Sequence, residues 1–595
     1  MVSSNWQQQI QLAQISRQSG SPHHHARAAA SLSRSSGALG GVLPGGIASL
    51  DIASKLGGFL SSPPPASAKM QHRMDDVGAG DIGARSLATR EQKDRRQDWA
   101  ALDLGGQGLR NISPNLFNYN FLDKLYLNHN RLTTLPVAIG NLGQLQYLDI
   151  SGNLLTSLPT EIGMLKSLRT LLMFDNGIQS LPSEMGFLYK LEVLGIEGNP
   201  LPEAVKSLMS RDGTRGVITE LRDNSPMPSA PQPRDWVVLD ERESEKGAED
   251  GVFTILSYNI LCQWYTGVYG YTPSWAIAWD YRKENIRQEI ESYDADILCL
   301  QEVDTQTYEE FFQPMLEKDY ESHHWLKTRA KTMGDRERRK VDGCAIFFKK
   351  SVFRLLDKHS VEFNQLALQM LCPKESMSKY PDIYNRVATR DNIAVVCFLE
   401  HIKTGNRLMV TDAHIHWDQF DRDVKLVQVG LMLEELKLLA QKWVKTSPTP
   451  AADGKSKSGS VSRLYKSITQ LPIIICGDYN STPDSGVSQL VTQGSVPPDH
   501  EDFQEFKYGK FSDAGISHPF TLKSSYANIG ELAFTNCTPT FTDVIDYIWY
   551  STNNLHVTAL IGDVDKEYMT RVIGFPNVHF PSDHVSLLAQ LQFKT

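Results

Sequence analysis

The stretch IIICGDYNSTPDS, residues 473–485, indicates how the carboxyl-terminal part of this chain folds. Residues 473–476 are apolar or small and lead into Gly477, a pattern typical of a buried strand that ends at a turn. Asp478 and Asn480 follow two residues apart, so in an extended chain both side chains lie on the same side. A carboxylate and an amide at the end of a buried strand predict a site that holds a charged group.

Similar apolar runs recur through residues 250–595 and alternate with helical stretches such as 423–444. Many strands interleaved with few helices predict a layered α/β sandwich. The expected strands lie within residues 253–261, 295–303, 343–350, 392–400, 407–416, 471–480, 544–551 and 585–593.

Polar side chains stand where these strands end. Burying such groups unpaired is costly, and ligands of α/β sheets bind at strand ends, so we expect the side chains to converge. Carboxylates from separate strands suit Mg²⁺, whereas the absence of clustered Cys ligands argues against structural zinc. The set consists of Asn259, Glu302, His414, His416, Asp478, Asn480, Asp546, Asp583 and His584.

Single members of this set have simpler explanations. Glu302 alone fits a solvated residue at a strand exit, and His416 fits a packing or capping histidine. Asp543 fits a turn residue. The recurrence of such residues at five strand ends nevertheless favours a site.

A different pattern fills the region from Leu102 to about Leu201. An Asn recurs every 23 residues, at Asn130, Asn153, Asn176 and Asn199. A Leu stands five residues before each of them. This spacing is that of the leucine-rich repeat. Stacked repeats offer an extended binding surface and no chemistry of their own.

Four segments are therefore expected. Residues 1–95 are rich in Ser, Ala, Gly, Gln and Pro, which predicts disorder. Residues 96–203 form the repeats, and the Pro-rich and charge-rich residues 204–249 form a linker. Residues 250–595 form the α/β domain.

Composition limits the class of protein. The chain of 595 residues is 41% hydrophobic and 22% charged, as in soluble globular proteins. Its formal net charge of −9 argues against a general nucleic-acid coat, but a local basic track remains compatible with it. No apolar run is long enough to predict a membrane span. Seven scattered cysteines without a CxxC pair indicate a reducing compartment, the cytosol or nucleus.

The strand-end motifs resemble those of the endonuclease–exonuclease–phosphatase superfamily. They are SYN at 257–259, LQEVD at 300–304, GDYNSTPDS at 477–485, VIDYIWYS at 544–551 and SDH at 582–584. With repeats ahead of them, the chain is similar to the carbon catabolite repression deadenylases, catalytic subunits of the Not-type deadenylase complex. The resemblance implies a four-layered α/β sandwich and a 3′–5′ exoribonuclease that shortens mRNA poly(A) tails and releases 5′-AMP.

The resemblance also implies roles for particular residues. The metal site would hold two Mg²⁺ ions through Glu302, Asp478, Asn259 and Asp583. The catalytic residues would be Asp478, His584, Asp546, His414 and Asn480. Asp478 would orient or deprotonate the attacking water and Asn480 would hold the scissile phosphate. Asp546 would orient His584, and His414 would donate to a phosphate oxygen.

Substrate contacts are implied in the same way. They would involve Glu302, Glu337, His414, Asn480, Asn536 and Phe541. A Phe ring can stack on an unpaired adenine. The basic residues between 327 and 340 would form either a phosphate track or a solvated surface run. Two departures from the family pattern are Gln419, where a Pro is frequent, and Asp412, where an Asn is frequent. The first puts strict adenine preference in question, and neither removes a metal ligand.

Partners and alternatives complete the hypothesis. The resemblance implies single-stranded poly(A) RNA as substrate, a second deadenylase subunit docked on the repeats, the Not scaffold, no membrane, and residence in cytoplasm and nucleus. One alternative is a superfamily relative that hydrolyses a small-molecule or lipid phosphoester or acts on damaged DNA; the repeats together with Glu337, Asn536 and Phe541 speak against it. The other is a catalytically silent repeat scaffold, which the intact polar set speaks against.

Overall fold

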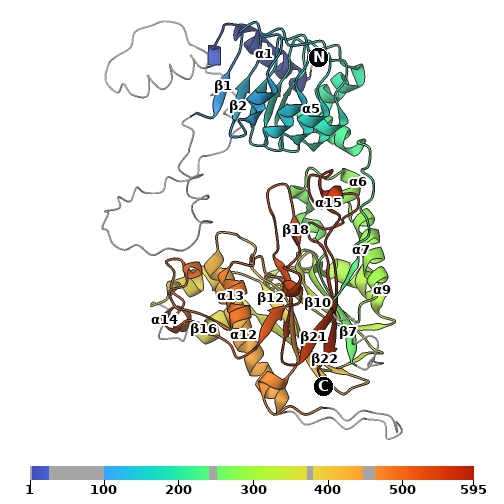
Figure 1. Cartoon of the computed structure of the whole chain (residues 1–595), viewed down its shortest axis with the longest axis vertical. Helices are drawn as coiled ribbons and strands as arrows, with labels where there is room; N and C mark the ends of the chain where they lie inside the picture. The colour runs from blue at the N-terminus through green and yellow to red at the C-terminus, as the bar shows by residue number, and fades with distance from the viewer. Residues whose placement is uncertain (1–2, 26–98, 240–250, 372–378, 446–462, 595) are drawn as a thin grey trace. The chain divides into compact units, whose positions relative to one another are not determined.

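The computed structural model describes residues 3–25, 99–239, 251–371, 379–445 and 463–594. These residues form two compact units, Met1–Pro226 and Met227–Thr595 (Figure 1). Most of the segment predicted to be disordered, residues 26–95, lies outside the described residues, as does the last part of the predicted linker, residues 240–249.

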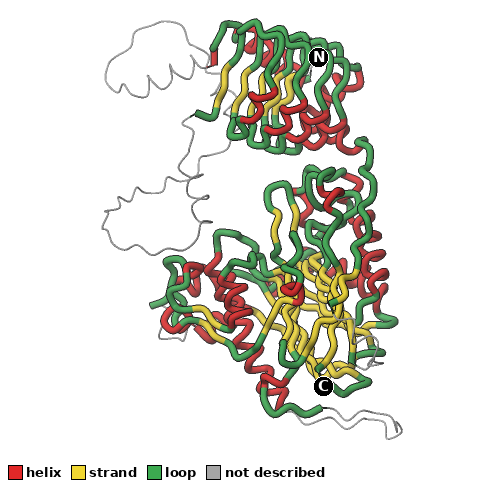
Figure 2. The backbone as a smooth tube through the Cα atoms, viewed as in Figure 1, coloured by secondary structure: helices red, strands yellow, loops and turns green. Residues whose placement is uncertain are grey.

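The first unit contains the predicted repeats. Five short parallel strands form one sheet in chain order, and a 3-10 helix follows each of the first four strands (Figure 2). The repeated Asn side chains join successive turns: Asn153 donates to the carbonyls of Leu127 (3.0 Å) and Ile150 (2.9 Å) and accepts from the Leu132 amide (3.1 Å). The strands are β1 (Ala101–Asp103), β2 (Lys124–Tyr126), β3 (Tyr147–Asp149), β4 (Thr170–Leu172) and β5 (Val193–Gly195); the 3-10 helices are η1 (Pro114–Asn118), η2 (Val137–Asn141), η3 (Thr160–Met164) and η4 (Ser183–Phe187).

The predicted linker differs from what the structure shows. Its first part is helix α5 (Glu203–Asp223), which belongs to the repeat unit. The helix buries Met209, Val217 and Ile218 in the core of the repeats, because the last repeat of any stack needs a cover for its apolar end. Further on, β6 (Trp236–Val238) pairs with a strand of the second unit. The boundary between the units therefore lies at residues 226–227 and no long linker precedes β6.

Helix α1 (Ser4–Gln18) is a second difference, because these residues were expected to be disordered. Leu12 and Ala13 of this helix pack against Leu172 and Phe174, on the strand side of the repeats. Trp6 also packs against the core of the repeats, but the remaining residues of the helix are mostly polar, so its sequence shows no clear apolar period. Contacts with the repeats rather than intrinsic helix-forming pattern hold it in place.

Gln9 of α1 covers the free edge of the sheet. Its amide donates to the carbonyl of Leu194 (2.8 Å) and accepts from the amide of Ile196 (2.9 Å), both on or beside edge strand β5. Gln9→Ala should lower the free energy of unfolding by roughly 2 kcal/mol, since two buried backbone groups lose their partners. Denaturant unfolding of the full chain measures this, with Gln8→Ala on the exposed side of α1 as the control. Equal losses in both variants would show that Gln9 does not anchor the helix.

Asp149 of β3 makes the repeat unit sensitive to pH. Burial raises the pKa of its carboxyl to about 6. The folded chain therefore favours protonated Asp149, and this preference stabilises the fold. The stabilisation is complete below pH ~4 and is lost as the pH rises through the pKa of Asp149 in the folded chain. The Ser151 amide donates to Asp149 Oδ1 at 2.9 Å, and Asp149→Asn keeps an oxygen for this bond. The variant should add roughly 1–2 kcal/mol of stability at pH 7.5 and little at pH 4. Unfolding at both pH values checks this; a loss of stability at pH 7.5 would contradict it.

Two large sheets build most of the second unit. One has seven strands in the order β6-β21-β22-β7-β8-β10-β9, and the other has six in the order β11-β12-β13-β14-β20-β17. The first comprises β21 (Leu555–Ile561), β22 (Leu587–Phe593), β7 (Val252–Asn259), β8 (Ile297–Asp304), β10 (Asp342–Lys349) and β9 (Tyr320–Leu326) beside β6; the second comprises β11 (Phe353–Glu362), β12 (Ile393–His401), β13 (Arg407–His414), β14 (Ile473–Asp478), β20 (Asp546–Ser551) and β17 (Leu522–Ser524).

Three apolar cores separate the layers of this unit. One core lies between the two sheets, a second joins the seven-stranded sheet to α7 (Trp279–Tyr293), and a third joins the six-stranded sheet to α12 (Arg422–Val444). The order helix, sheet, sheet, helix is the predicted four-layered sandwich. Within the parts of the chain that are described, no helix has the length and apolar character needed to cross a bilayer.

Candidate active site

A β-bulge places Glu302. Gly343 of β10 pairs with Val303, but the next residue, Cys344, pairs with Gln301, so Glu302 has no partner across the ladder. Its φ of 63° lies in the left-handed region, where a Glu is strained. A bulge re-aims the side chain of its extra residue. That strain indicates that the fold holds Glu302 in a particular orientation, into the site.

Gly477 explains how β14 ends at Asp478. Its φ is 136°, and an added Cβ would lie 1.9 Å from the carbonyl oxygen of Ala413, so only glycine allows β14 to approach β13 this closely. The parallel register sets Asp478 beside His414. Asn480 was expected to continue the extended chain, but its φ of 49° lies in the left-handed region. Its backbone amide donates to Asp478 (2.9 Å). The chain therefore turns immediately after Asp478 and leaves its carboxylate at the strand end.

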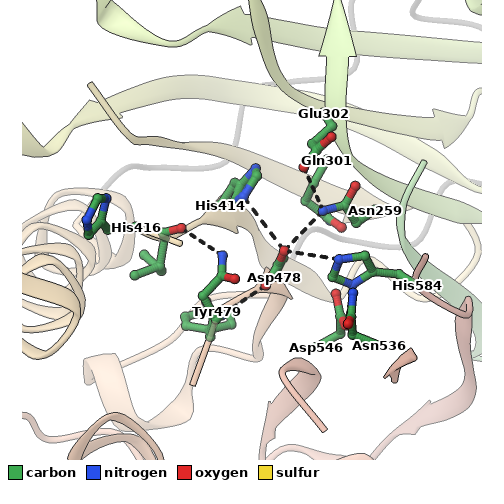
Figure 3. A network of polar contacts seen from close by, with 12 residues as sticks. Asn259, Gln301, Glu302, His414, His416, Asp478, Tyr479, Asn536, Asp546 and His584 are labelled. Carbon is green, nitrogen blue, oxygen red and sulfur yellow. Dashed lines mark hydrogen bonds and ion pairs between the residues drawn. The ribbon is translucent and has the colours of Figure 1, made fainter. Parts of the chain in front are cut away.

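Asp478 is the centre of a buried polar group (Figure 3). Asn259 donates to Asp478 Oδ2 at 3.0 Å and to Glu302 Oε1 at 3.2 Å. The Nε2 atoms of His414 and His584 each lie 3.7 Å from Asp478 Oδ2. These residues come from both sheets, so the site forms where the ends of β7, β8, β13 and β14 meet. The polar group joins most predicted site residues: Asn259, Glu302, His414, Asp478, Asn480, Asn536, Asp546, Asp583 and His584.

Charge within this group is unevenly distributed. Burial, together with the like charge of Asp546, raises the pKa of Asp478 to about 7. His584 Nδ1 lies 2.8 Å from Asp546 Oδ2. Burial opposes a charged imidazole, yet the neighbouring carboxylates, Asp546 foremost, raise the pKa of His584 well above its usual value. Burial and the Lys327 ammonium hold the pKa of His414 well below its usual value. One imidazole is thus poised to be cationic and the other neutral.

Asp583 is held by two donors from distant segments. Its Oδ2 accepts from Asn536 Nδ2 (3.0 Å) and from the Tyr269 hydroxyl (2.7 Å). Asn536 lies on β18 (Asn536–Cys537), and Phe541 lies half-buried in the turn that joins it to β19 (Thr542–Asp543). The hairpin therefore carries two of the residues predicted to contact the nucleotide, Asn536 and Phe541. Tyr269 was missed because its loop carries several Tyr residues with no distinguishing spacing.

A buried ion pair stands behind Glu302. Lys327 Nζ lies 2.7 Å from Asp342 Oδ2, and Arg329 lies 2.7 Å from Oδ1 of the same carboxylate. Burial and the neighbouring Asp342 raise the pKa of Glu302, while Lys327 opposes this. The first two members of the expected basic track are therefore paired with Asp342, and Lys327 is buried whereas Arg329 is half-buried.

The rest of the basic stretch lies on the surface. Glu337, on the short helix α10 (Asp335–Arg338), pairs with Lys340 at 3.0 Å and is exposed, so in the described parts of the chain it makes no contact with the buried group. Lys331 pairs with Glu362, and Arg339 pairs with two glutamates. These ion pairs account for Lys331, Arg339 and Lys340, whereas Arg336 and Arg338 are exposed and form no ion pair within the described residues, so the stretch keeps positive charge that suits either a phosphate track or a solvated surface run.

Two further expectations concern the strand that bears His414. His416 Nε2 lies 2.9 Å from Asp421 Oδ2. This contact fits the packing or capping histidine considered above. Asp412 is buried and accepts from Gln301 at 2.6 Å, away from solvent. Gln419 is exposed on the loop that follows.

Comparison with known proteins decides the family. Residues 256–584 match the endonuclease/exonuclease/phosphatase family, and residues 102–219 match a leucine-rich repeat region. Over its whole length the chain is 49% identical to "CCR4-Not complex 3′-5′-exoribonuclease subunit Ccr4" of Coccidioides immitis (strain RS), covering 76% of that protein. It is 48% identical to the protein of the same name from Mycosarcoma maydis, covering 90% of it. The chain belongs to the Ccr4 family of 3′-5′-exoribonucleases.

Membership of the Ccr4 family confirms the recognised resemblance, the fold class and the predicted enzyme class. Among solved structures, ANGEL2, described as a 2′,3′-cyclic phosphatase in complex with adenosine-2′,3′-vanadate, is 25% identical. It covers 61% of this chain and 99% of its own, with a TM-score of 0.45.

The Ccr4-family site has the donor groups of a divalent metal centre. One ligand atom from each of Asp478, Asp546 and His584 lies within 4.8 Å of the others. His584 already uses Nδ1 for Asp546, which leaves Nε2 facing Asp478. Buried carboxylates with raised pKa values, as at Asp478 and Glu302, are the groups that a cation would stabilise. The carboxylate oxygens of this group fit a divalent ion with a preference for oxygen ligands, while His584, paired with Asp546, is left for proton transfer.

Proposed function

We propose that this enzyme shortens mRNA poly(A) tails from the 3′ end, releases 5′-AMP and requires Mg²⁺. The observation that carries the proposal is the buried convergence on Asp478 of an amide, a second carboxylate and two imidazoles. Such a group combines a proton acceptor with donors for phosphate oxygens, as in-line phosphodiester hydrolysis requires.

Four oxygen-bearing side chains would hold the metal: Glu302, Asp478, Asn259 and Asp583. Bound there, Mg²⁺ would supply positive charge that stabilises the phosphate oxygens. Two ions remain the proposed number. The bulge at Glu302 and the glycine turn before Asp478 support this set, since both present a carboxylate to one point.

Side chains of the protein would accept and donate the protons of the reaction. Asp478, with a pKa of about 7, can accept a proton from the attacking water near neutral pH. His584, kept cationic and oriented by Asp546, can donate to a phosphate oxygen. His414 acts as a neutral donor. Asn480 gives one amide hydrogen to the Ile415 carbonyl (3.0 Å) and retains a second for the phosphate.

Asn536 and Phe541 would contact the terminal adenosine from the hairpin of β18 and β19, with Phe541 stacking on the base. The repeats would dock a second deadenylase subunit and, through it, the Not scaffold, because the relatives from Coccidioides immitis and Mycosarcoma maydis carry the name of CCR4-Not subunits. Helix α1 covers part of the strand side of the repeats, so docking would use the surface that α1 leaves exposed. Such an enzyme would work in the cytoplasm and nucleus.

The test compares RNA substrates that end in twenty adenosines or in another base, with Mg²⁺ or with EDTA. A Mg²⁺-dependent ladder from the 3′ end, strongest on adenosine and absent in Glu302→Ala, is expected. A ladder of equal strength on every tail would remove the adenine preference, and Gln419→Pro should then restore part of it. No ladder with the purified chain would contradict the proposed activity.

A further inference from the structure

The loop that follows β7 carries an exposed aromatic ring close to the active site. The Cys262 amide donates to Glu302 Oε2 at 2.7 Å, and Trp264, two residues further along, is 46% exposed. The hydroxyl of Tyr265 donates to Asp342 Oδ1 at 2.5 Å. The residues on either side of Trp264 are therefore anchored to the ends of the site strands, while its ring is presented to solvent.

Helix α10 lies beside this loop and carries the unpaired positive charge of the basic stretch. Lys340, just after the helix, places its Nζ atom 5.0 Å from the centre of the Trp264 ring. Within the described residues, the exposed Arg336 and Arg338 form no ion pair. The chain then leads directly into β10, which pairs with β8, the strand of Glu302. An aromatic ring and two arginines thus belong to one rim of the active site.

This rim lies on the expected path of the RNA. Under the proposed function the terminal adenosine lies on the hairpin of Asn536, and in Figure 3 Asn536 and Glu302 lie on opposite sides of Asp478. The nucleotides 5′ of the cleaved bond therefore leave the site on the side of Glu302, where the loop of Trp264 and α10 form its edge. Single-stranded RNA offers unpaired bases that stack on aromatic rings and phosphates that bind arginine.

We infer that Trp264, Arg336 and Arg338 bind the RNA on the 5′ side of the cleaved bond. The indole stacks on a base, and the two guanidinium groups contact phosphates. This inference rests on the proposed function for the side on which the terminal nucleotide lies. The three residues take no part in the chemical step, so their loss should weaken binding of an RNA long enough to reach the rim and leave the shortest substrate unaffected.

The experiment uses the full chain with Trp264→Ala, Trp264→Phe and the double variant Arg336→Ser/Arg338→Ser. The Kd of a labelled RNA of ten adenosines is measured in EDTA at several salt concentrations. In Mg²⁺, kcat/KM is measured on the same RNA and on an adenosine dinucleotide, which is too short to reach the rim.

Two controls match these variants in exposure and charge. Trp236→Ala is the control for the ring, because Trp236 is 44% exposed on β6, at the far edge of the seven-stranded sheet. Lys318→Ser/Lys350→Ser is the control for charge. Both lysines are exposed where β9 begins and β10 ends, at the opposite end of these strands from Glu302.

Trp264→Ala should raise Kd at least about fivefold without changing its dependence on salt, and Trp264→Phe should recover most of the affinity, because a ring is restored for stacking. The arginine variant should weaken binding and lower the slope of log Kd against log salt by about 1.4, since each phosphate contact of a single strand contributes ~0.7. On the dinucleotide, kcat/KM of every variant should stay within about twofold of the wild type. Both controls should match the wild type in all measurements.

A wild-type Kd in Trp264→Ala, an unchanged salt slope in the arginine variant, or equal losses on the dinucleotide and the longer RNA would each overturn the inference. A wild type that does not bind the longer RNA in EDTA would also overturn it, because the contacts at the rim need no metal. A wild type that binds this RNA but does not shorten it in Mg²⁺ would instead contradict the proposed function. The Kd values in EDTA would still decide the inference, so the two failures are distinguishable.

Discussion

Asp478→Asn should reduce RNA hydrolysis at least ~10³-fold at pH 7.5, because asparagine keeps the shape of the side chain but cannot accept a proton from water. Asn259, His414 and His584 all face Asp478. Initial rates on labelled adenosine-tailed RNA measure the loss.

The control for this variant is Asp484→Asn. Asp484 lies six residues further along, is exposed, and bonds the Thr482 hydroxyl. It should keep full activity. In EDTA, Asp478→Asn should melt at or above the wild-type temperature, since a buried carboxylate beside Asp546 is removed. If Asp478→Asn kept more than about a tenth of the activity, Asp478 would not be the proton acceptor.

Arg282→Met should cost about 3–5 kcal/mol of unfolding free energy. Its guanidinium is fully buried and donates to the carbonyls of Ile260 (3.1 Å), Leu261 (3.0 Å) and Pro581 (2.9 Å). These carbonyls flank Asn259 on one side and Asp583 on the other. Removing the guanidinium leaves all three without a partner in a dry interior.

The same helix offers the comparison for Arg282. Arg287 on α7 is partly exposed and pairs with Glu284 and Glu291. Arg287→Met should therefore cost less than about 1 kcal/mol. Urea unfolding of the full chain measures both variants, and similar losses for the two would show that the buried carbonyls find other partners.

Much of the site followed from strand-end chemistry. Asn259, Glu302, Asp478, Asp546 and His584 could be predicted because a polar residue at the end of an apolar run is costly unless it meets a partner. The repeats followed from the regular placing of Asn and Leu, since each Asn bonds the turn beside it. Both patterns are formed by residues close together along the chain, so they can be recognised in the sequence.

Other features depended on contacts between distant segments. Tyr269 and Arg282 carry no local signal, because the partner of Tyr269 and one partner of Arg282 lie about 300 residues further along. Glu337 matched a family position, yet it pairs with Lys340 on the surface. Helices α1 and α5 were missed because polar and Pro-rich surroundings masked short apolar contacts with the repeats.

The sequence by itself determined the repeats, the alternation of strands and helices, and the residue types that a phosphodiesterase needs. Only the tertiary structure decided how those residues are aimed. The left-handed turn at Glu302, the close approach at Gly477 and the sharing of Asp583 by two donors arise where strands from both sheets meet. Local pattern specifies which groups are present, whereas packing of distant segments specifies their direction, because direction depends on neighbours that are remote along the chain.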